Sequence, residues 1–390
     1  MRGISRSSFN VGVKVYDSDW FIKYKLSYAE AAKTLKDWGC SFVLAQSKYL
    51  PMPDSAVKSE AGPDSSDRYA QLSDRAFRDA LSAEGVDYWA TVCMFFDPYE
   101  IEKNPELRPV GSDGEPMEMV DWYIGIAPAQ EVFVKQRVDQ IVNAVKALEP
   151  KGVFLSFMRW PGFWELWKPE SAKLEFPEYC FSAHVLGKFS EDLSIEIPAG
   201  ETKFQADFIF SNHRATWVEW KCEQVLQVIR NLKEKIREID PDIQIMLNTL
   251  PFGNADYGNA QKSYFGQDIE RLNQVVDVFE VMTYHQILNR PVEWIPRIGK
   301  EIKERTGKKT YCTIQVKPHY IDGIHKGYMR NEAISVGEFD HTVRLVEEHD
   351  LDGVVIFVWS DLLEEMLLRN NSAHIQALQS VKSARELKQD

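Results

Sequence analysis

An isolated glutamate interrupts one of the most apolar segments of the chain. Glu280 lies in the segment VDVFEVMTYH, where a strand buried on both faces is predicted. A charge inside such a strand is costly unless it is paired or has a function. Glu280 is therefore either a catalytic carboxylate or one half of a structural ion pair with a Lys or Arg inside the fold.

A second carboxylate, Glu165, lies in the aromatic segment RWPGFWELW. An aromatic pocket raises the pKa of a carboxyl group, which suits a general acid; the alternative is a loop carboxylate in solvent. Cleavage of a glycosidic bond needs two carboxyl groups that flank it, roughly 5–5.5 Å apart for retention and 6.5–9.5 Å for inversion. We predict Glu280 as the nucleophile or general base and Glu165 as the general acid.

Other residues at the predicted strand ends suit a sugar, because sugar rings stack on Trp and Tyr and sugar hydroxyls need donors and acceptors. Any single tryptophan among the eleven more often packs in a core. The predicted binding residues are Lys14, Asp17, Arg159, Trp160, Tyr284, His285, Gln315, Trp359 and Asp361.

These residues are expected to have different roles. Trp160, Tyr284 and Trp359 would form stacking walls, and His285 and Gln315 would donate hydrogen bonds. Arg159 and Asp17 would bind hydroxyls or a substrate anion. A substrate carboxylate or sulfonate would be held by Lys14, Arg159 and Lys317. Asp361 could equally cap a helix over residues 362–368.

Eight apolar runs can supply the strands that position these side chains. Most are continuous rather than alternating, as expected of parallel strands buried on both faces. They are Val11–Val15, Phe42–Ala45, Tyr88–Phe95, Gly152–Phe157, Gln244–Asn248, Val278–Thr283, Lys309–Gln315 and Gly353–Val358.

Helical patterns lie between these runs, for example the apolar stripes within residues 134–148 and 225–239. Eightfold strand–helix alternation predicts an α/β fold, a (β/α)₈ TIM barrel of parallel strands. A doubly wound open sheet is the alternative, but it usually carries a Gly-rich phosphate turn after its first strand. The first strand here is followed by YDSDW instead.

We expect one domain over residues 1–390, with long segments at about 46–66, 96–130 and 159–216 after the second, third and fourth strands. In a barrel these segments lie on the C-terminal face, where active sites are found. The alternative is that they are decorative or form an oligomer contact, so a homo-oligomer is left open.

Composition excludes several classes of partner. A net charge of −13 argues against a nucleic-acid partner. No stretch approaches 18 apolar residues, so no membrane span is expected, and MRGISRSSFN has no apolar core of a signal peptide. The five cysteines are scattered and form no CxxC pair, which fits a reducing compartment and a cytoplasmic protein. No cofactor is expected.

Several segments resemble a broad group of (β/α)₈ barrels described as hypothetical or "family-10-like" glycosyl hydrolases, related more distantly to hydrolase domains that process poly-N-acetylglucosamine. The resemblance spans roughly residues 90–365 and implies a barrel and glycan hydrolysis. The segments are NPELRPVGSDGEP, GVFLSFMRWPGFWE, PEYCFSAHVLGKF, GNADYGNAQKSYFGQDIERL, VDVFEVMTYHQILNRPVEWI and DGVVIFVWSDLL.

The chain departs from that group at chemically important positions. The group has an Asp in the fourth-strand motif, where this chain has Ser156, and Glu280 stands in the sixth-strand motif. The seventh strand, TYCTIQVKPHY, has no Glu, which argues against retaining barrels with a nucleophile there. Either the catalytic carboxylate has moved to Glu280, or the barrel binds sugar without cleaving it.

Two alternatives to a hydrolase therefore stay open. The first is a non-catalytic carbohydrate-binding barrel, which Ser156 motivates. The second is a metal-dependent sugar isomerase or aldolase, in which Glu280, His285, Asp256 and His319 would form an oxygen-rich site for Mg²⁺ or Mn²⁺. No HxH or HExxH spacing supports that metal site.

Overall fold

The chain folds into a closed barrel of eight parallel strands, as the computed structural model shows for residues 9–50, 63–167 and 177–386. Each strand pairs with its neighbour in sequence, and the first pairs with the last, which closes the barrel. The strands are β1 Asn10–Val15, β2 Phe42–Ala45, β3 Asp87–Cys93, β4 Gly152–Ser156, β5 Gln244–Thr249, β6 Val278–Val281, β7 Lys309–Gln315 and β8 Gly353–Phe357.

All eight predicted strands are confirmed, because each apolar run overlaps one strand of the barrel. Parallel strands covered by helices lie between two apolar layers, so nearly every position is buried; all four residues of β2, β4's five and β6's four are examples. The fold class predicted from the alternation, a (β/α)₈ barrel, is confirmed.

The barrel interior is filled by side chains in layers. One apolar cluster closes its lower part and consists of Phe42, Leu44, Trp89, Phe154, Met246, Val278, Tyr311 and Val355. Polar side chains lie towards the C-terminal ends of the strands, among them Lys14 on β1, Asn248 on β5 and Glu280 on β6. Inside the barrel, apolar side chains are therefore replaced by polar ones towards the C-terminal ends of the strands.

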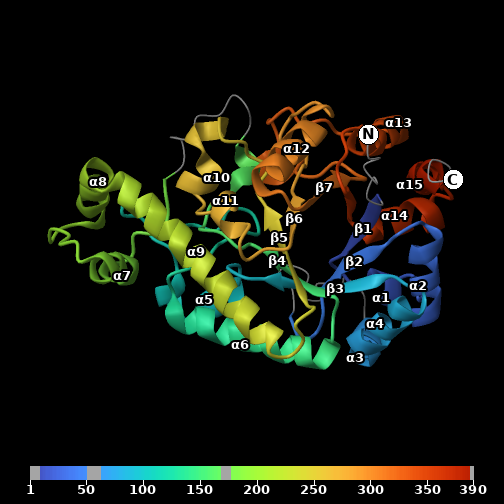
Figure 1. Ribbon diagram of the computed structural model, residues 1–390, viewed down its shortest axis with the longest axis horizontal. Coiled ribbons are helices and arrows are strands. Elements are labelled where there is room, and N and C mark those ends of the chain that lie inside the picture. The colour runs from blue at the N-terminus through green and yellow to red at the C-terminus, as the bar shows by residue number, and fades with distance from the viewer. Residues whose placement is uncertain (1–8, 51–62, 168–176, 387–390) are drawn as a thin grey trace, which may run out of the picture.

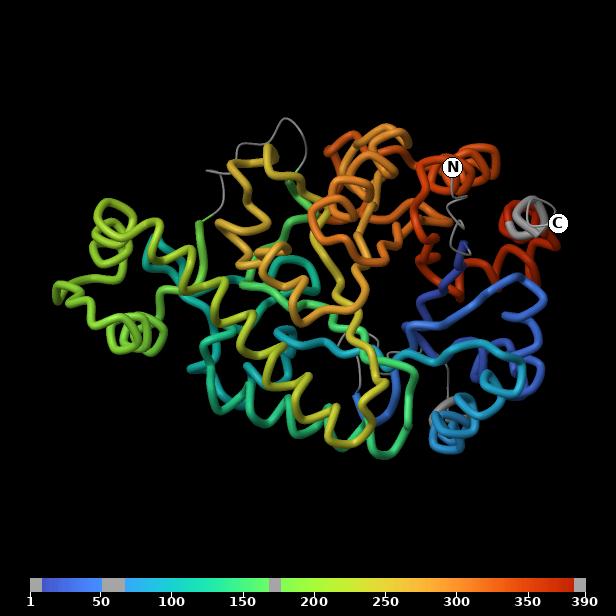
Figure 2. The backbone as a smooth tube through the Cα atoms, in the orientation of Figure 1, coloured from blue at the N-terminus to red at the C-terminus, as the bar shows by residue number. Residues whose placement is uncertain are grey.

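Helices surround the barrel (Figures 1 and 2). They are α1 Asp19–Ile22, α2 Tyr28–Asp37, α3 Pro63–Gln71, α4 Asp74–Ala83, α5 Pro98–Lys103, α6 Glu131–Leu148, α7 Ala183–Leu193, α8 Thr202–Asn212, α9 Arg214–Arg237, α10 Ala260–Ser263, α11 Ile269–Leu272, α12 Trp294–Thr306, α13 Val336–Glu348, α14 Trp359–Leu363 and α15 Ala373–Glu386. Short 3₁₀ turns include Trp164–Leu166, and a π-helical turn spans Glu364–Leu368.

The predicted helix stripes face the barrel. Val138, Ile141, Val145 and Leu148 of α6 are buried, and so are Val225, Ile229, Leu232 and Ile236 of α9. Local signals set some helix ends: Ser27 and Glu30 form a reciprocal capping box at the start of α2. The amphipathic pattern thus predicts which helix faces pack on the strands.

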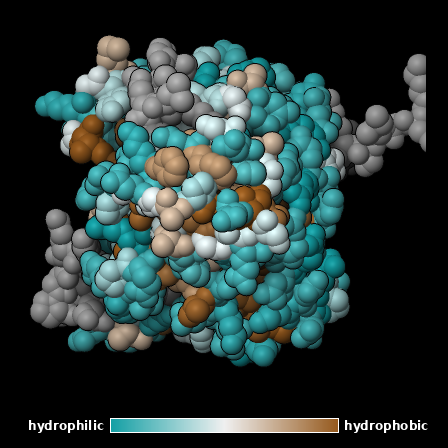
Figure 3. All heavy atoms as spheres, turned by 90° about the vertical axis from the view of Figure 1, so that its left-hand side faces the viewer, coloured by the Kyte–Doolittle hydropathy of each residue, from teal (hydrophilic) through white to brown (hydrophobic). Residues whose placement is uncertain are grey.

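The long segment after β4 forms a projection at one end of the molecule. Its helices α7 and α8 extend away from the barrel at the left of Figures 1 and 2. Figure 3 views the molecule from that side, which is mainly hydrophilic with scattered apolar side chains. Most of the predicted long segment 46–66, by contrast, lies outside the described residues.

The structure also bears on the expectations about disulfides and membrane spans. All five cysteines are buried and none forms a disulfide. Over the ranges that the structure describes, no helix combines the length and apolar character needed to cross a bilayer.

A glycine at the barrel seam gives a test of this packing. Gly353 has a φ of +152°, and an added Cβ would overlap the backbone oxygen of Asn10, its partner on β1. Because two paired backbones cannot yield easily, we expect Gly353→Ala to lower the free energy of unfolding by at least about 2 kcal/mol.

Gly187 is the matched control. It lies in α7, and a Cβ there meets no atom within 4 Å. Gly187→Ala should raise the free energy of unfolding by about 0.5–1 kcal/mol, because Ala is the better helix former. Denaturant unfolding measures both, and equal effects of the two substitutions would contradict the seam packing.

Candidate functional site

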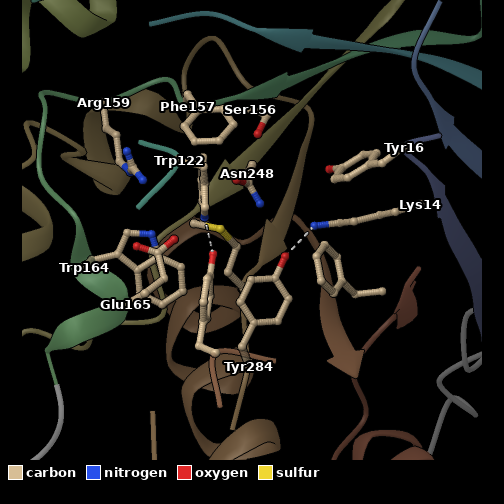
Figure 4. A pocket seen from close by; sticks show the side chains of 13 residues that line it. Lys14, Tyr16, Trp122, Ser156, Phe157, Arg159, Trp164, Glu165, Asn248 and Tyr284 are labelled. Carbon is tan, nitrogen blue, oxygen red and sulfur yellow. Dashed lines mark hydrogen bonds between the residues drawn. The ribbon is translucent and has the colours of Figure 1, made fainter. Parts of the chain in front are cut away.

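A cavity of about 160 Å³ opens at the C-terminal ends of the strands (Figure 4). Five strands, β1, β4, β5, β6 and β8, or the residues directly after them contribute to its wall, and further aromatic residues come from the longer loops. The lining residues are Lys14, Tyr16, Trp122, Ser156, Phe157, Arg159, Trp164, Glu165, Asn248, Met282, Tyr284, Tyr320 and Phe357.

Lys14 and Glu280 form an ion pair across the barrel interior. Lys14 Nζ lies 3.1 Å from Glu280 Oε1, although β1 and β6 are not neighbours in the sheet. Lys14 Nζ also donates a hydrogen bond to Tyr284 Oη at 3.1 Å, and Asn248 Nδ2 donates to Glu280 Oε2. The structure thus contains the ion pair that was one of the two interpretations of Glu280.

Burial disfavours both charges of this pair. It lowers the pKa of Lys14 and raises the pKa of Glu280, while the opposite charge of each partner counteracts these changes. Glu280 is 0% exposed and is not among the residues that line the cavity, whereas Lys14 is. Glu280, the predicted nucleophile, is therefore linked to the cavity only by its ion pair with Lys14. Its catalytic role stays a prediction.

Glu165 lies on the cavity wall, in the 3₁₀ turn Trp164–Leu166. Burial raises its pKa to about 7, against the opposing charges of Arg159 and Arg330. Its Oε2 atom is buried and has no hydrogen-bond partner among the described residues. Glu165 therefore has the aromatic surroundings inferred from RWPGFWELW. Near neutral pH its carboxyl group can hold a proton and donate it.

Arg159 lies near Glu165 on one side of the cavity, and Lys14 and Tyr16 lie on the other side in the view of Figure 4. Arg159 is 3% exposed, and its Nη1 donates to Tyr123 Oη at 3.2 Å. Its guanidinium lies 5.2 Å from the centre of the Tyr123 ring. A buried cation and a carboxyl group with a raised pKa thus occupy the same wall.

Aromatic rings form most of the remaining wall. Trp164 stacks on Tyr284, with ring centres 6.0 Å apart and an interplanar angle of 17°. Trp122 Nε1 donates to Tyr320 Oη at 2.9 Å, which joins the segments after β3 and β7 above the cavity. Rings with fixed orientation can stack on the C–H face of a sugar.

Trp122 and Tyr320 are absent from the predicted site, as are Tyr16, Phe157, Met282 and Phe357. A signal for Trp122 existed, because the segment 96–130 was expected on the C-terminal face. No signal singled out Tyr320, which lies beyond the end of β7. The structure joins these two residues through a hydrogen bond between chain segments that are far apart in sequence.

Two predicted stacking residues lie elsewhere. Trp160 points beneath α9, where its Nε1 donates to the carbonyl of Lys221 at 3.0 Å and its ring packs on Trp217 and Trp220. Trp359 packs in the core against Trp20 and Phe77. Neither is among the lining residues of the cavity, where Trp164 and Tyr284 supply stacking surface.

Four predicted polar residues also have other partners. His285 Nε2 lies 2.7 Å from Glu338 Oε1, and Gln315 Nε2 donates to Gln286 Oε1 at 3.1 Å. Asp17 Oδ1 accepts a hydrogen bond from the backbone N–H of Asp19 at 3.0 Å, and burial raises the pKa of Asp17. Asp361 itself lies 3.7 Å from Lys317 Nζ. Of the predicted set, the cavity brings together Lys14, Arg159, Glu165 and Tyr284.

The four residues considered for a metal site are dispersed. Glu280 pairs with Lys14 and His285 with Glu338, while Asp256 faces Arg290 and His319 faces Asp361, each at 3.7 Å. Among the described residues, no group of three or more His, Cys, Asp or Glu side chains is arranged to hold a metal ion.

Solved structures with a similar fold include glycoside hydrolases. The chain superimposes on the PgaB (BpsB) glycoside hydrolase domain from Bordetella bronchiseptica with a TM-score of 0.66 and 12% identity, over 94% of this chain and 98% of that domain. The catalytic domain of β-amylase from Paenibacillus polymyxa gives 0.55 and 11%, over 92% and 94%.

A β-galactosidase from the psychrophilic Marinomonas ef1 gives a TM-score of 0.60 and 11% identity, over 90% of this chain and 54% of the longer enzyme. The chain thus spans about half of that protein. No family model and no curated protein matches the sequence. At these identities the likeness establishes the barrel fold.

The buried ion pair leads to a stability prediction. Lys14→Met and Glu280→Gln should each lower the free energy of unfolding by about 3–5 kcal/mol, because each leaves an uncompensated buried group. The double variant should be clearly more stable than the sum of these losses implies.

The exposed pair Lys33–Asp37 on α2 is the control, since its substitution should cost no more than about 0.5 kcal/mol. Urea unfolding of the single and double variants measures the coupling. Losses below about 1 kcal/mol at positions 14 and 280 would show that the pair does not support the barrel.

Proposed function

We propose that this chain is a glycoside hydrolase that uses Glu165 as its general acid. The observation that carries the proposal is one buried carboxyl group, with a pKa raised to about 7, on the wall of an aromatic-lined cavity at the C-terminal face of a barrel. The glycoside hydrolases with the same fold support the class of reaction.

The size of the cavity favours one sugar unit. At roughly 10–15 Å³ for each water-sized group, a volume of about 160 Å³ admits on the order of ten such groups, close to one monosaccharide ring with its substituents. Trp164 and Tyr284 would stack on the ring, and Asn248 and Tyr16 would meet its hydroxyls. We therefore propose cleavage of a terminal residue.

In the proposed reaction, protonated Glu165 donates its proton to the glycosidic oxygen as the bond to the leaving group breaks. The positive charge that develops on the sugar ring is shared with its ring oxygen. The deprotonated Glu165 is then stabilised by the nearby charge of Arg159, which already lowers its pKa relative to burial alone.

The second proton transfer is assigned to the Lys14–Glu280 pair. Lys14 is the member that lines the cavity and can contact the attacking water, and Glu280 stabilises the charge on Lys14. Burial lowers the pKa of Lys14, which brings its amine closer to the range in which it exchanges a proton with water. Glu280 thereby acts as a positioning residue within the predicted pair.

A non-catalytic sugar-binding barrel is the second candidate. It is favoured by the occupation of both Glu280 oxygens by Lys14 and Asn248, and by Ser156 at the end of β4. This candidate predicts that the chain binds an oligosaccharide and releases no reducing sugar from it.

Hydrolysis of glycosides with poor leaving groups tests the proposal. Glu165→Gln should lower kcat by roughly 10²–10⁴-fold, because proton donation to the leaving group is lost. The effect should be smaller for aryl glycosides whose leaving group needs no proton. Wild-type kcat should fall as the pH rises above about 7, and Glu165→Gln should lack this fall.

Glu304→Gln, an exposed carboxylate on α12, is the control and should retain wild-type rates. Glu280→Gln should lower kcat through the altered base. Wild-type rates in both Glu165→Gln and Glu280→Gln would remove the proposed mechanism, and binding without any hydrolysis would select the second candidate.

A further inference from the structure

The guanidinium of Arg159 is the least satisfied buried charge on the cavity wall. Among the described residues, its one side-chain hydrogen bond is the Nη1 donation to Tyr123, and its buried Nε has no partner. No carboxylate of the described residues lies within ion-pair distance of it, even though the side chain is 3% exposed. A buried cation in this state is costly unless a partner is supplied.

Other buried cations in the described part of the chain are satisfied by protein groups. Carboxylates pair with Lys14, Arg137, Lys221 and Lys233 at 3.1, 2.6, 2.6 and 2.8 Å. Arg330 instead donates to the carbonyls of Ile287, Tyr320 and Glu165 at 2.7, 3.0 and 2.6 Å. Arg159 departs from this pattern, and it is the one that faces the cavity together with Lys14.

The nearby carboxyl group of Glu165 does not balance this charge when the site is ready to react. Glu165 must be protonated to act as the general acid, and in that form it is neutral. Lys14 and Glu280 already neutralise each other. The cavity with Glu165 protonated therefore carries one uncompensated positive charge, located at Arg159.

We infer that the sugar bound in this cavity carries a carboxylate, held by Arg159, so that the substrates are glycosides of a hexuronic acid. This inference rests on the proposed function. A carboxylate matches the planar guanidinium and offers it two acceptors, and a substrate anion would complete the charge balance that the protein leaves open.

The overall charge limits how acidic the substrate is. The chain carries a net charge of −13, which disfavours approach of a polyanion. The cavity also has room for about one ring. Both properties favour one terminal uronic acid on an otherwise neutral glycoside over a polyuronide.

Binding of matched free sugars tests the inference without any need for hydrolysis. Isothermal titration calorimetry would compare glucuronate with glucose, galacturonate with galactose, and mannuronate with mannose, since each pair differs by one carboxylate. In at least one pair, the wild-type chain should bind the acid at least about tenfold more tightly.

Arg159→Gln should remove this preference, so that the acid and the neutral sugar of each pair bind within about twofold of each other. Arg159→Lys keeps the charge without the planar fork and should retain part of the preference, which guards against a Gln variant that fails to fold. Arg344→Gln, at an exposed ion pair on α13, should behave as wild type.

Absence of a preference for the acid in all three pairs would overturn the inference, and so would a preference that survives in folded Arg159→Gln. A different result would overturn the proposed hydrolase function. In that case the chain still prefers uronates but cleaves neither neutral nor uronic glycosides. Cleavage of neutral glycosides with no uronate preference would overturn the uronic-acid inference alone.

Discussion

The interior of an apolar barrel can hold a charge only if another group compensates it, and the contact between Lys14 and Glu280 meets that requirement. The contact bridges two strands that are not neighbours in the sheet, so it exists only when the barrel is closed. It also separates the two predicted carboxylates. Glu280 is held beneath Lys14, and Glu165 is the carboxylate that meets the cavity.

The elements of the fold were largely predictable, because apolar runs and helix stripes are local features of the sequence. The unusual position of Glu280 was equally visible as one charge in an apolar strand. Its partner was not visible, since Lys14 meets it only through barrel closure. Trp160 and Trp164 show the same limit: four residues apart, one packs beneath α9 and the other lines the cavity. Their directions follow from tertiary packing after β4.

Two effects in the cavity change the pKa of Glu165 in opposite directions. Burial favours the protonated form of Glu165, and the neighbouring Arg159 limits how far its pKa rises. Because the folded-state pKa of about 7 lies above the ordinary value of 4.5, the stabilising contribution of protonated Glu165 is complete below pH 4.5 and is lost as the pH rises through about 7. The contribution of Glu165 thus makes the folded chain less stable in alkaline than in acidic solution.

The protonation state of Glu165 is the most direct test of this account. Infrared difference spectra of the wild-type chain against Glu165→Gln, recorded from about pH 5 to pH 9, would follow the carbonyl band of one buried protonated carboxyl group. The account predicts that this band is present at low pH and disappears with a pKa of about 7. A band that is already mostly absent at about pH 5, as expected for a glutamate with the ordinary pKa of 4.5, would contradict it.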